Sequence, residues 1–223
     1  MSRDRVQLAE ALYILPAGPG RLMNSYLLDD VVLDSGLRWS GKVIARSLRG
    51  ATVRSHALSH AHFDHAGSSG WLCRELAVPL FVGAADAEAM ATGRVDTHGG
   101  PVANAFARMF RTEAHPVERG LKEGDVVGGF EVLEVPGHSP GALAFWRASD
   151  KVLICGDTVT NLFGTGTKPR LMMVPGLLNH DTAQGRSSLA KLTELRPSLA
   201  CFGHGPPVTD PGLFASRVNR LAT

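Results

Sequence analysis

The chain of 223 residues is 44% hydrophobic, enough to fill a sizeable core, and we expect a single domain over residues 1–223. Its formal net charge of +2 comes from 23 basic and 21 acidic residues without a long basic run, which argues against nucleic-acid and membrane-surface partners. No window has transmembrane length and the N-terminus lacks an apolar signal core, so we expect a soluble, cytoplasmic protein.

The first half of the chain alternates short β-like runs with helical stretches. The apolar pattern predicts one helix over 39–50 and a second over 69–78. Strands are predicted at 24–28, 31–36 and 52–60, and a strand followed by a helix at 79–91. Residues 92–115 are the least periodic part of the chain, and we expect a lid or an insertion there.

The second half is richer in strands, which are predicted at 128–137, 141–148, 151–158 and 199–205. A helix is predicted over 178–195, with Asp181 as its N-cap and Gln184 three residues later, and a further helix ends the chain. Strands in both halves with helices between them fit two sheets packed face to face and covered by helices outside. The irregular segments 92–115 and 161–179 are expected to build a substrate pocket.

Three cysteines, Cys73, Cys155 and Cys201, are far apart in the sequence and lie among apolar neighbours. This arrangement provides neither a disulfide framework nor a C-x-x-C metal site. We therefore expect all three to be small core residues.

The six-residue stretch "HAHFDH" (60–65) crowds three histidines and an aspartate together directly after a predicted strand. Further histidines and an aspartate follow other predicted strands, namely His138, Asp157 and His204. Side chains at strand ends project from one rim of a sheet, so these distant positions can converge there. The sequence therefore predicts one cluster of imidazole and carboxylate groups.

Imidazole nitrogens and carboxylate oxygens are preferred ligands of zinc and related divalent ions, whereas closed structural zinc sites favour thiolates. More groups are present than one ion needs. We expect His60, His62 and His138 on one ion, Asp64, His65 and His204 on a second, and Asp157 between them. Each ion would keep an open position for water, which is typical of a catalytic metal.

These motifs, H60-x-H62-x-D64-H65, "PGHSPG" around His138, "CGDT" around Asp157 and "FGHG" around His204, resemble the metallo-β-lactamase superfamily in its hydroxyacylglutathione-hydrolase-like branch. The resemblance runs from about Asn24 to the end of the chain. It implies an α+β fold, an αββα four-layer sandwich of two mixed β-sheets flanked by helices, with a dinuclear site at one edge. It also implies that Asp34, in "LDSG", supports the site from beneath, although an aspartate before Ser-Gly equally fits a simple turn.

The sequence departs from several members of that superfamily. Glutathione thioester hydrolases usually carry a further helical portion with basic residues, whereas this chain stops soon after His204. Homoserine-lactone hydrolases use a tyrosine downstream of the bridging aspartate, whereas the tyrosines here are Tyr13 and Tyr26. True β-lactam hydrolases commonly lack the glycine-flanked "GHG" arrangement and tend to be exported, so we do not expect antibiotic hydrolysis.

The favoured hypothesis is a hydrolase in which a hydroxide bound to two divalent ions cleaves an ester, thioester or lactone bond of a small-molecule substrate. We expect Zn²⁺, with Fe or Mn as alternatives, and we expect Asp64 to orient the nucleophile and relay its proton. The persulfide dioxygenases of the same superfamily, which hold a single iron with two histidines and an aspartate, are the alternative. A third hypothesis, metals that only stabilise the fold or a partner surface, conflicts with the open positions. We expect the histidines outside the motifs, His56, His98, His115 and His180, not to be ligands.

Overall fold

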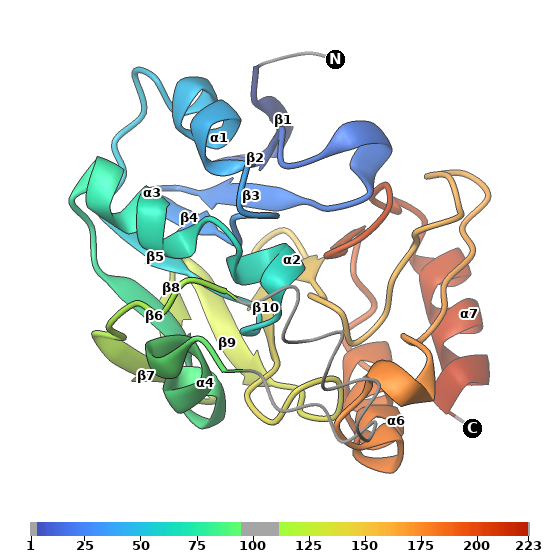
Figure 1. Cartoon of the computed structure of the whole chain (residues 1–223). Helices are drawn as coiled ribbons and strands as arrows, with labels where there is room; N and C mark the ends of the chain where they lie inside the picture. The colour runs from blue at the N-terminus through green and yellow to red at the C-terminus, as the bar shows by residue number, and fades with distance from the viewer. Residues whose placement is uncertain (1–3, 95–111, 223) are drawn as a thin grey trace.

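Two mixed β-sheets pack face to face in the computed structural model, which describes residues 4–94 and 112–222 (Figure 1). In the seven-stranded sheet the strands follow the chain from β1 to β7, antiparallel between neighbours up to β4 and parallel from there on. These strands are β1 (Val6–Ala9), β2 (Leu12–Leu15), β3 (Ser25–Leu28), β4 (Val31–Leu33), β5 (Ser55–Ala57), β6 (Leu80–Gly83) and β7 (Arg119–Leu121).

The five-stranded sheet has the order β12-β11-β10-β9-β8, in which only β11 and β12 run parallel. Its strands are β8 (Val126–Val127), β9 (Phe130–Glu134), β10 (Leu143–Arg147), β11 (Val152–Ile154) and β12 (Leu199–Cys201). Parallel neighbours need a crossover connection, and α6 (Thr182–Thr193) supplies it between β11 and β12.

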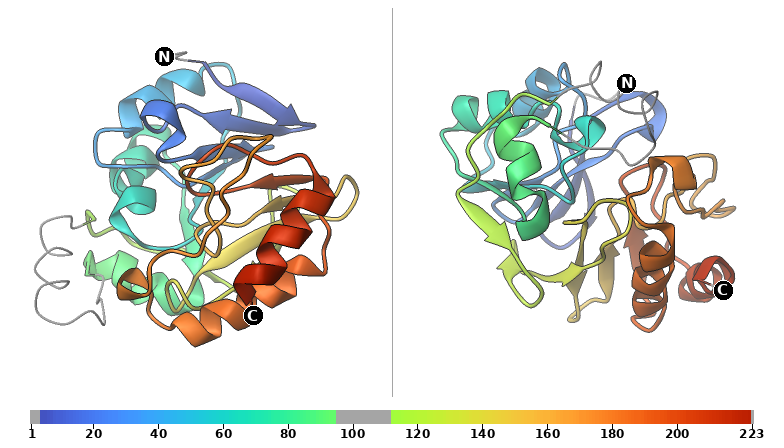
Figure 2. Two further views of the ribbon diagram at one scale, coloured as in Figure 1. Left: turned by 90° about the vertical axis from the view of Figure 1, so that its right-hand side faces the viewer. Right: turned by 60° about the horizontal axis from the view of Figure 1, so that its bottom comes forward.

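Helices cover the outer face of each sheet, which produces the four layers (Figure 2). The seven-stranded sheet is covered by α1 (Gly41–Ser47), α3 (Ser69–Leu76) and α4 (Ala87–Thr92), and the five-stranded sheet by α6 and α7 (Pro211–Ala222). The one-turn helix α2 (Phe63–Ala66) and the 3₁₀ turns η1 (Pro19–Arg21), η2 (Ala84–Asp86) and η3 (Gly176–Leu178) lie in connections. None of the described helices is long and apolar enough to cross a bilayer.

Alternating side chains explain why both faces of these strands are apolar. On β3, Tyr26 and Leu28 enter the core between the sheets, whereas Leu27 faces the layer of α1 and α3. Val32 and its neighbours on β4 repeat this division. A strand that is covered on both sides reads as a continuous apolar run, because successive residues point to opposite faces and both faces are buried.

The αββα sandwich expected from the motifs is therefore confirmed. Asp181 accepts a hydrogen bond from the backbone N–H of Gln184 (2.9 Å) at the start of α6, as its predicted N-cap role requires. The three cysteines are buried and unpaired, as expected of core residues. Of the segment 92–115, residues 95–111 lie outside the described residues, so the lid or insertion stays a prediction.

Several strands were not predicted from the sequence. These are β1, β2, β7 and β8, each of two to four residues. Both residues of β8 are valines but one is exposed, and β1 has no fully buried residue. Such short segments carry too few alternations to give a periodic signal, and β1, β7 and β8 are moreover edge strands. The strand predicted at 52–60 is observed only as β5, Ser55–Ala57, because the chain leaves the sheet after Ala57 to form the histidine-rich loop.

Candidate metal centre

The chemically distinctive side chains follow the ends of four strands and gather at one edge of the sandwich. His60 and His62 follow β5, and Asp64 and His65 stand on α2 directly behind them. The remaining groups follow β9, β11 and β12, namely His138, Asp157 and His204. The chain ends each strand with glycine or serine near these positions, so the backbone can turn sharply there.

The structure brings all of these side chains together in overlapping groups whose ligand atoms lie within 4.8 Å of one another. The three groups are His60, His62 and His138; His60, His65 and Asp157; and Asp64, His65 and His204. The first and third share no residue, and the second joins one histidine of each through Asp157. The described part of the chain thus contains two neighbouring groups that could each hold a cation.

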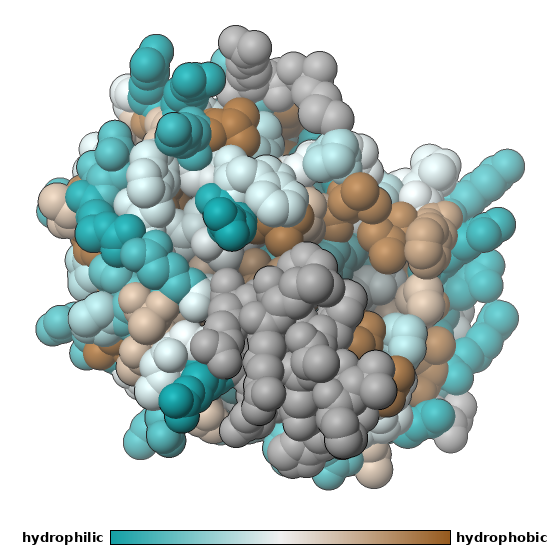
Figure 3. Space-filling model, viewed as in Figure 1, coloured by the Kyte–Doolittle hydropathy of each residue, from teal (hydrophilic) through white to brown (hydrophobic). Residues whose placement is uncertain are grey.

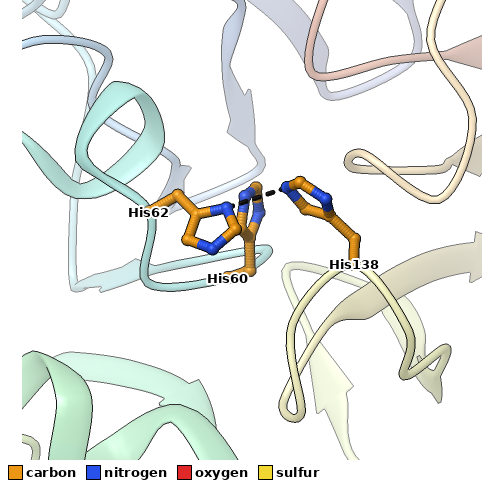
Figure 4. Close-up of side chains that lie close together, drawn as sticks. All are labelled: His60, His62 and His138. Carbon is orange, nitrogen blue, oxygen red and sulfur yellow. Dashed lines mark hydrogen bonds between the residues drawn. The ribbon is translucent and has the colours of Figure 1, made fainter. Parts of the chain in front are cut away.

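The three-histidine group is shown in Figure 4, where His60 and His62 approach from one loop and His138 from another. The Nδ1 atom of His62 lies 2.8 Å from Nε2 of His138, and the ring of His60 stands edge-on to both, with centroids 4.6 Å and 4.7 Å away. Three imidazoles that turn nitrogen atoms toward one point form the usual donor set of a zinc site.

The second group gathers around Asp157, which is buried. Its Oδ2 lies 3.0 Å from Nε2 of His204 and 3.8 Å from Nε2 of His138, while Oδ1 lies 3.4 Å from Nε2 of His65. Asp64 completes this side, with Oδ2 3.4 Å from Nε2 of His204. One carboxylate therefore reaches histidines of both groups, as expected of a bridging position.

The outer nitrogens of four of the five histidines in the cluster have hydrogen-bond partners. Through Nδ1, His138 donates to Oδ1 of Asn179 (2.9 Å), His65 to Oδ2 of Asp34 (2.9 Å), and His204 to the carbonyl of Leu22. His60 contacts Oγ of Ser59 at 3.1 Å through its own Nδ1. A hydrogen bond of this kind at the far nitrogen fixes the tautomer and ring orientation that a metal ligand needs.

Three further observations test whether a cation fits here. Nε2 of His60 and Oδ1 of Asp157 are buried without a hydrogen-bond partner among the described residues, although buried polar atoms normally have one. A Cβ atom on Gly203 would lie only 2.1 Å from Oδ1 of Asp157 and 2.5 Å from Cε1 of His65, so only a glycine lets these two side chains keep their positions in the cluster. A divalent cation satisfies the unpaired atoms and suits the nitrogen and oxygen donor set, so the residues fit such an ion.

Without an ion the two groups differ in charge. Burial lowers the pKa of His60 well below its ordinary value, and the pKa of His62 to about 3, with neighbouring histidines adding to both effects. Burial opposes charge on His204 as well, but Asp157 outweighs it and raises the pKa of His204 to about 10. Burial likewise opposes charge on Asp157, yet His204 and His65 hold the pKa of its carboxyl well below the ordinary range. His60 and His62 are therefore neutral at pH 7, and the Asp157 side holds paired charges.

Asp34 supports the cluster and also makes the turn after β4. Its backbone has a φ of 58°, the left-handed conformation that aspartate tolerates in turns. Its carboxylate accepts hydrogen bonds from Ser59 N (2.7 Å), Ser59 Oγ (2.8 Å) and His65 Nδ1 (2.9 Å). The turn is therefore observed, and these hydrogen bonds agree with the expected support of the metal ligands, which stays a prediction.

The remaining histidines lie outside the three groups wherever the structure describes them. His56 is fully buried and bonds the carbonyl of Val32 and Oγ of Ser69, each at 2.8 Å, which is a structural role. His115 is partly exposed, and His98 lies outside the described residues. Sequence reasoning missed Ser59, Asn179 and Asp86, which hold the loops of the cluster. Only Ser59 had a usable signal, because it directly precedes the histidine-rich stretch.

A hollow of about 340 Å³ opens beside His62 and His138. Its walls come from α4, from the loop around Pro140 and from residues 178–180. Ala85, Ala89 and Leu178 give it an apolar side, while Arg94 and His180 are among its polar residues. In the view of Figure 3, hydrophobic surface gathers on the right, where segment 161–179 lies. In that segment the residues Phe163, Leu177 and Leu178 are 66%, 68% and 48% exposed.

Known proteins of similar sequence include metal-dependent hydrolases. The chain is 27% identical over 240 residues to the "Probable metallo-hydrolase YflN" of Bacillus subtilis, which covers 97% of this chain and 88% of that protein. It is 30% identical over 150 residues to a hydroxyacylglutathione hydrolase of Bdellovibrio bacteriovorus, over 65% of this chain and 46% of that protein. The expected resemblance to this branch is confirmed.

Solved structures agree with these relatives. TTHA1623, solved in a di-iron-bound form, is 31% identical, with a TM-score of 0.65 over 89% of this chain and 94% of its own. BLEG-1, described as a B3 metallo-β-lactamase, is 25% identical, with a TM-score of 0.70 over 95% of this chain and all of its own. The profile of the metallo-β-lactamase superfamily matches residues 18–204, which include every group of the cluster. This chain, with its αββα sandwich and its histidine-aspartate cluster at one edge, belongs to the metallo-β-lactamase superfamily.

Proposed function

We propose that the chain, acting as one domain, is a hydrolase that uses two divalent cations to cleave an ester, thioester or lactone bond of a small molecule. One observation carries the proposal: two ligand groups without a common member are joined by the single carboxylate of Asp157. His60, His62 and His138 would hold one cation, Asp64, His65 and His204 the other, and Asp157 would contact both. When bound, such cations polarise a carbonyl oxygen and lower the pKa of water to about 7.

The chain's own residues would bind the substrate and accept the proton of the attacking water. Asp64 has the more exposed of the two carboxylates in the cluster, with a quarter of its side chain accessible, whereas Asp157 is buried. Burial opposes a negative charge on Asp64. The hydrogen bond with His204 outweighs burial and lowers the pKa of Asp64 to about 2. Its carboxylate is therefore ionised at neutral pH, as a group that orients water and accepts a proton must be.

The hollow beside His62 and His138 would receive the substrate, with its apolar side against the acyl portion. Hydrolysis of a hydroxyacylated glutathione is the reaction named for one relative, which supports a thioester as one substrate class. Zn²⁺ is the expected metal, while the di-iron form of TTHA1623 keeps iron among the candidates.

Elemental analysis of the purified protein, paired with a panel of thioesters, lactones, esters and β-lactams, tests the proposal. We expect about two metal ions per chain and hydrolysis of a panel compound that stops on chelation and returns with added metal. Asp157→Ala should abolish activity and keep the fold, whereas His115→Ala, a histidine outside the cluster, should keep both. Hydrolysis that is unchanged by chelation would contradict the proposal. Iron near one per chain, with oxygen uptake on a glutathione persulfide, would favour the dioxygenase alternative instead.

A further inference from the structure

The carboxylate of Asp86 connects the two loops that carry the three-histidine group. Its Oδ2 accepts a hydrogen bond from the backbone N–H of Ala61 at 3.1 Å and from Oγ of Ser139 at 2.7 Å. Its Oδ1 accepts one from the backbone N–H of Gly141 at 2.7 Å. Ala61 lies between His60 and His62, and Ser139 directly follows His138. A single buried side chain, only 3% exposed, thus reaches both ligand-bearing loops.

The position of Asp86 in the chain makes these contacts informative. It occupies the N-cap of α4, where an aspartate usually accepts a hydrogen bond from the first turn of the helix. The side chain of Asp86 makes no such bond. A typical cap contributes about 1 kcal/mol to stability, so the chain forgoes a common source of helix stability and directs the carboxylate at the loops instead.

The backbone around Asp86 is pressed against the His138 loop. A Cβ atom on Gly141 would lie 2.5 Å from the backbone N of Asp86 and 2.8 Å from its Cγ. A Cβ atom on Gly83, at the end of β6, would lie 2.0 Å from the carbonyl oxygen of Gly141. Neither glycine has room for a side chain, because the two backbone segments approach each other so closely. The end of β6 is therefore a fixed support, and Asp86 ties the loops to it.

The other group has different supports. His65 is held by Asp34, and His204 by the carbonyl of Leu22. None of the hydrogen bonds found for Asp86 goes to α2, which carries Asp64 and His65, or to the loops that carry Asp157 and His204. Loss of the Asp86 carboxylate should therefore act on one of the two proposed cation positions and spare the other.

We propose that Asp86 is a positioning residue that sets the spacing of His60, His62 and His138 and thereby the affinity of the cation position they form. The proposal rests on the proposed function, because it needs a cation at that position. The hydrogen bonds found for Asp86 go to neighbours of the ligands in the two loops and not to the ligand side chains. Asp86 acts only through the backbone of Ala61 and the two contacts beside His138.

Asparagine at this position tests the proposal with almost no change of volume. The carboxylate meets only donors, one hydroxyl and two backbone N–H groups. An amide has one acceptor oxygen, so its NH₂ group must face at least one backbone N–H. Two opposed donors in a buried place lose a hydrogen bond and push the groups apart. Asp86→Asn should therefore separate a ligand loop from its support.

Competition with a chromophoric chelator, using Zn²⁺ and the metal-free full-length protein, measures the two binding steps separately. We expect Asp86→Asn to weaken one step by about 10-fold or more and to leave the other unchanged, since supports of metal ligands typically contribute 10- to 100-fold in affinity. Ser139→Ala removes one of the three hydrogen bonds and should weaken the same step by less. Glu88→Gln, which removes an exposed carboxylate two residues away, should leave both affinities unchanged.

A merely structural role would give a different result. In that case Asp86→Asn would lower the melting temperature of the metal-free protein and weaken both steps alike, or change neither, and each result would overturn the proposal. If Asp86→Asn fails to fold, Ser139→Ala replaces it as the test, because this variant keeps the Asp86 carboxylate. Unchanged affinities at both Zn²⁺-binding steps of Ser139→Ala would then overturn the proposal. Absence of Zn²⁺ binding by the unaltered protein would instead refute the proposed function.

Discussion

His65 donates through Nδ1 to Oδ2 of Asp34 across 2.9 Å, and both side chains are almost completely inaccessible to solvent. The same carboxylate holds Ser59, which contacts Nδ1 of His60 at 3.1 Å. Asp34 thus reaches both proposed cation positions, in contrast to Asp86. This difference separates the effects expected from the two aspartates.

Asp34→Asn should weaken Zn²⁺ binding at both steps, by about 10- to 100-fold at the step that involves His65. Asparagine also adopts a positive φ, so the turn itself should survive. Chelator competition measures the affinities, and circular dichroism checks the fold. If only the step that Asp86→Asn weakens were affected, the division of supports between the two aspartates would be wrong.

Gly203→Ala should prevent metal binding around Asp157, because the new methyl group would lie 2.1 Å from Oδ1 of that residue. The methyl group would also crowd the ring of His65, so neither side chain could keep its position. Elemental analysis after dialysis against Zn²⁺ gives the stoichiometry. Gly212→Ala is the matched control, since a Cβ atom there would make only an ordinary contact, 3.4 Å from Asp210. Full occupancy in Gly203→Ala would show that the cation does not depend on these positions of Asp157 and His65.

The stability of the metal-free protein should fall as the pH drops from about 6.5 toward 4. Burial lowers the pKa of His56 to about 4, whereas in the unfolded chain it lies near 6.5, so the unfolded state binds more protons in this range. The neutral His56 therefore contributes its stability above pH 6.5 and loses it as the pH approaches 4, by about 3 kcal/mol.

Urea unfolding of the metal-free protein at several pH values measures this effect against His56→Asn, which does not titrate. Titration of the cluster is common to both proteins and cancels in the difference. We expect a smaller loss of unfolding free energy in the variant between pH 6.5 and 4. If the free energy of unfolding fell equally with pH in both proteins, His56 would be protonated without cost in the folded state.

Metal removal should lower the melting temperature and preserve the fold. The cores between the layers contain none of the proposed ligands, so the sandwich does not depend on a cation for its hydrophobic burial. Free metal at a thousand times its dissociation constant adds about 4 kcal/mol, which corresponds to a shift on the order of 10 °C. Calorimetry with and without chelator, together with far-ultraviolet circular dichroism, checks both parts. Global unfolding on chelation would point to a structural metal.

The layers and the candidate ligands could be predicted from the sequence because both leave local signals. Continuous apolar runs mark β3, β4 and β11, and the motif "HAHFDH" places four polar groups within six residues. Single histidines such as His138 and His204 carry no signal by periodicity, and it was the motif around each that singled them out.

The supports of the cluster could not be predicted, because they depend on contacts between distant parts of the chain. Asp86 and Gly141 are 55 residues apart, and His138 and Asn179 are 41 residues apart. In the sequence, Asp86 resembles an ordinary helix cap, and Asn179 an ordinary loop residue before α6. Their tasks appear only when β6 lies beside the His138 loop and residues 174–180 fold back over it.

The ligand-bearing loops begin at strand ends and form one wall of the hollow, whereas its other walls come from residues 85–94 and 178–180. In the proposed enzyme, the groups that react and many of the groups that select the substrate would consequently lie on different pieces of polypeptide. A graft that exchanges the walls should retarget such a scaffold without rebuilding its centre, provided that Asp86, which belongs to both pieces, is retained.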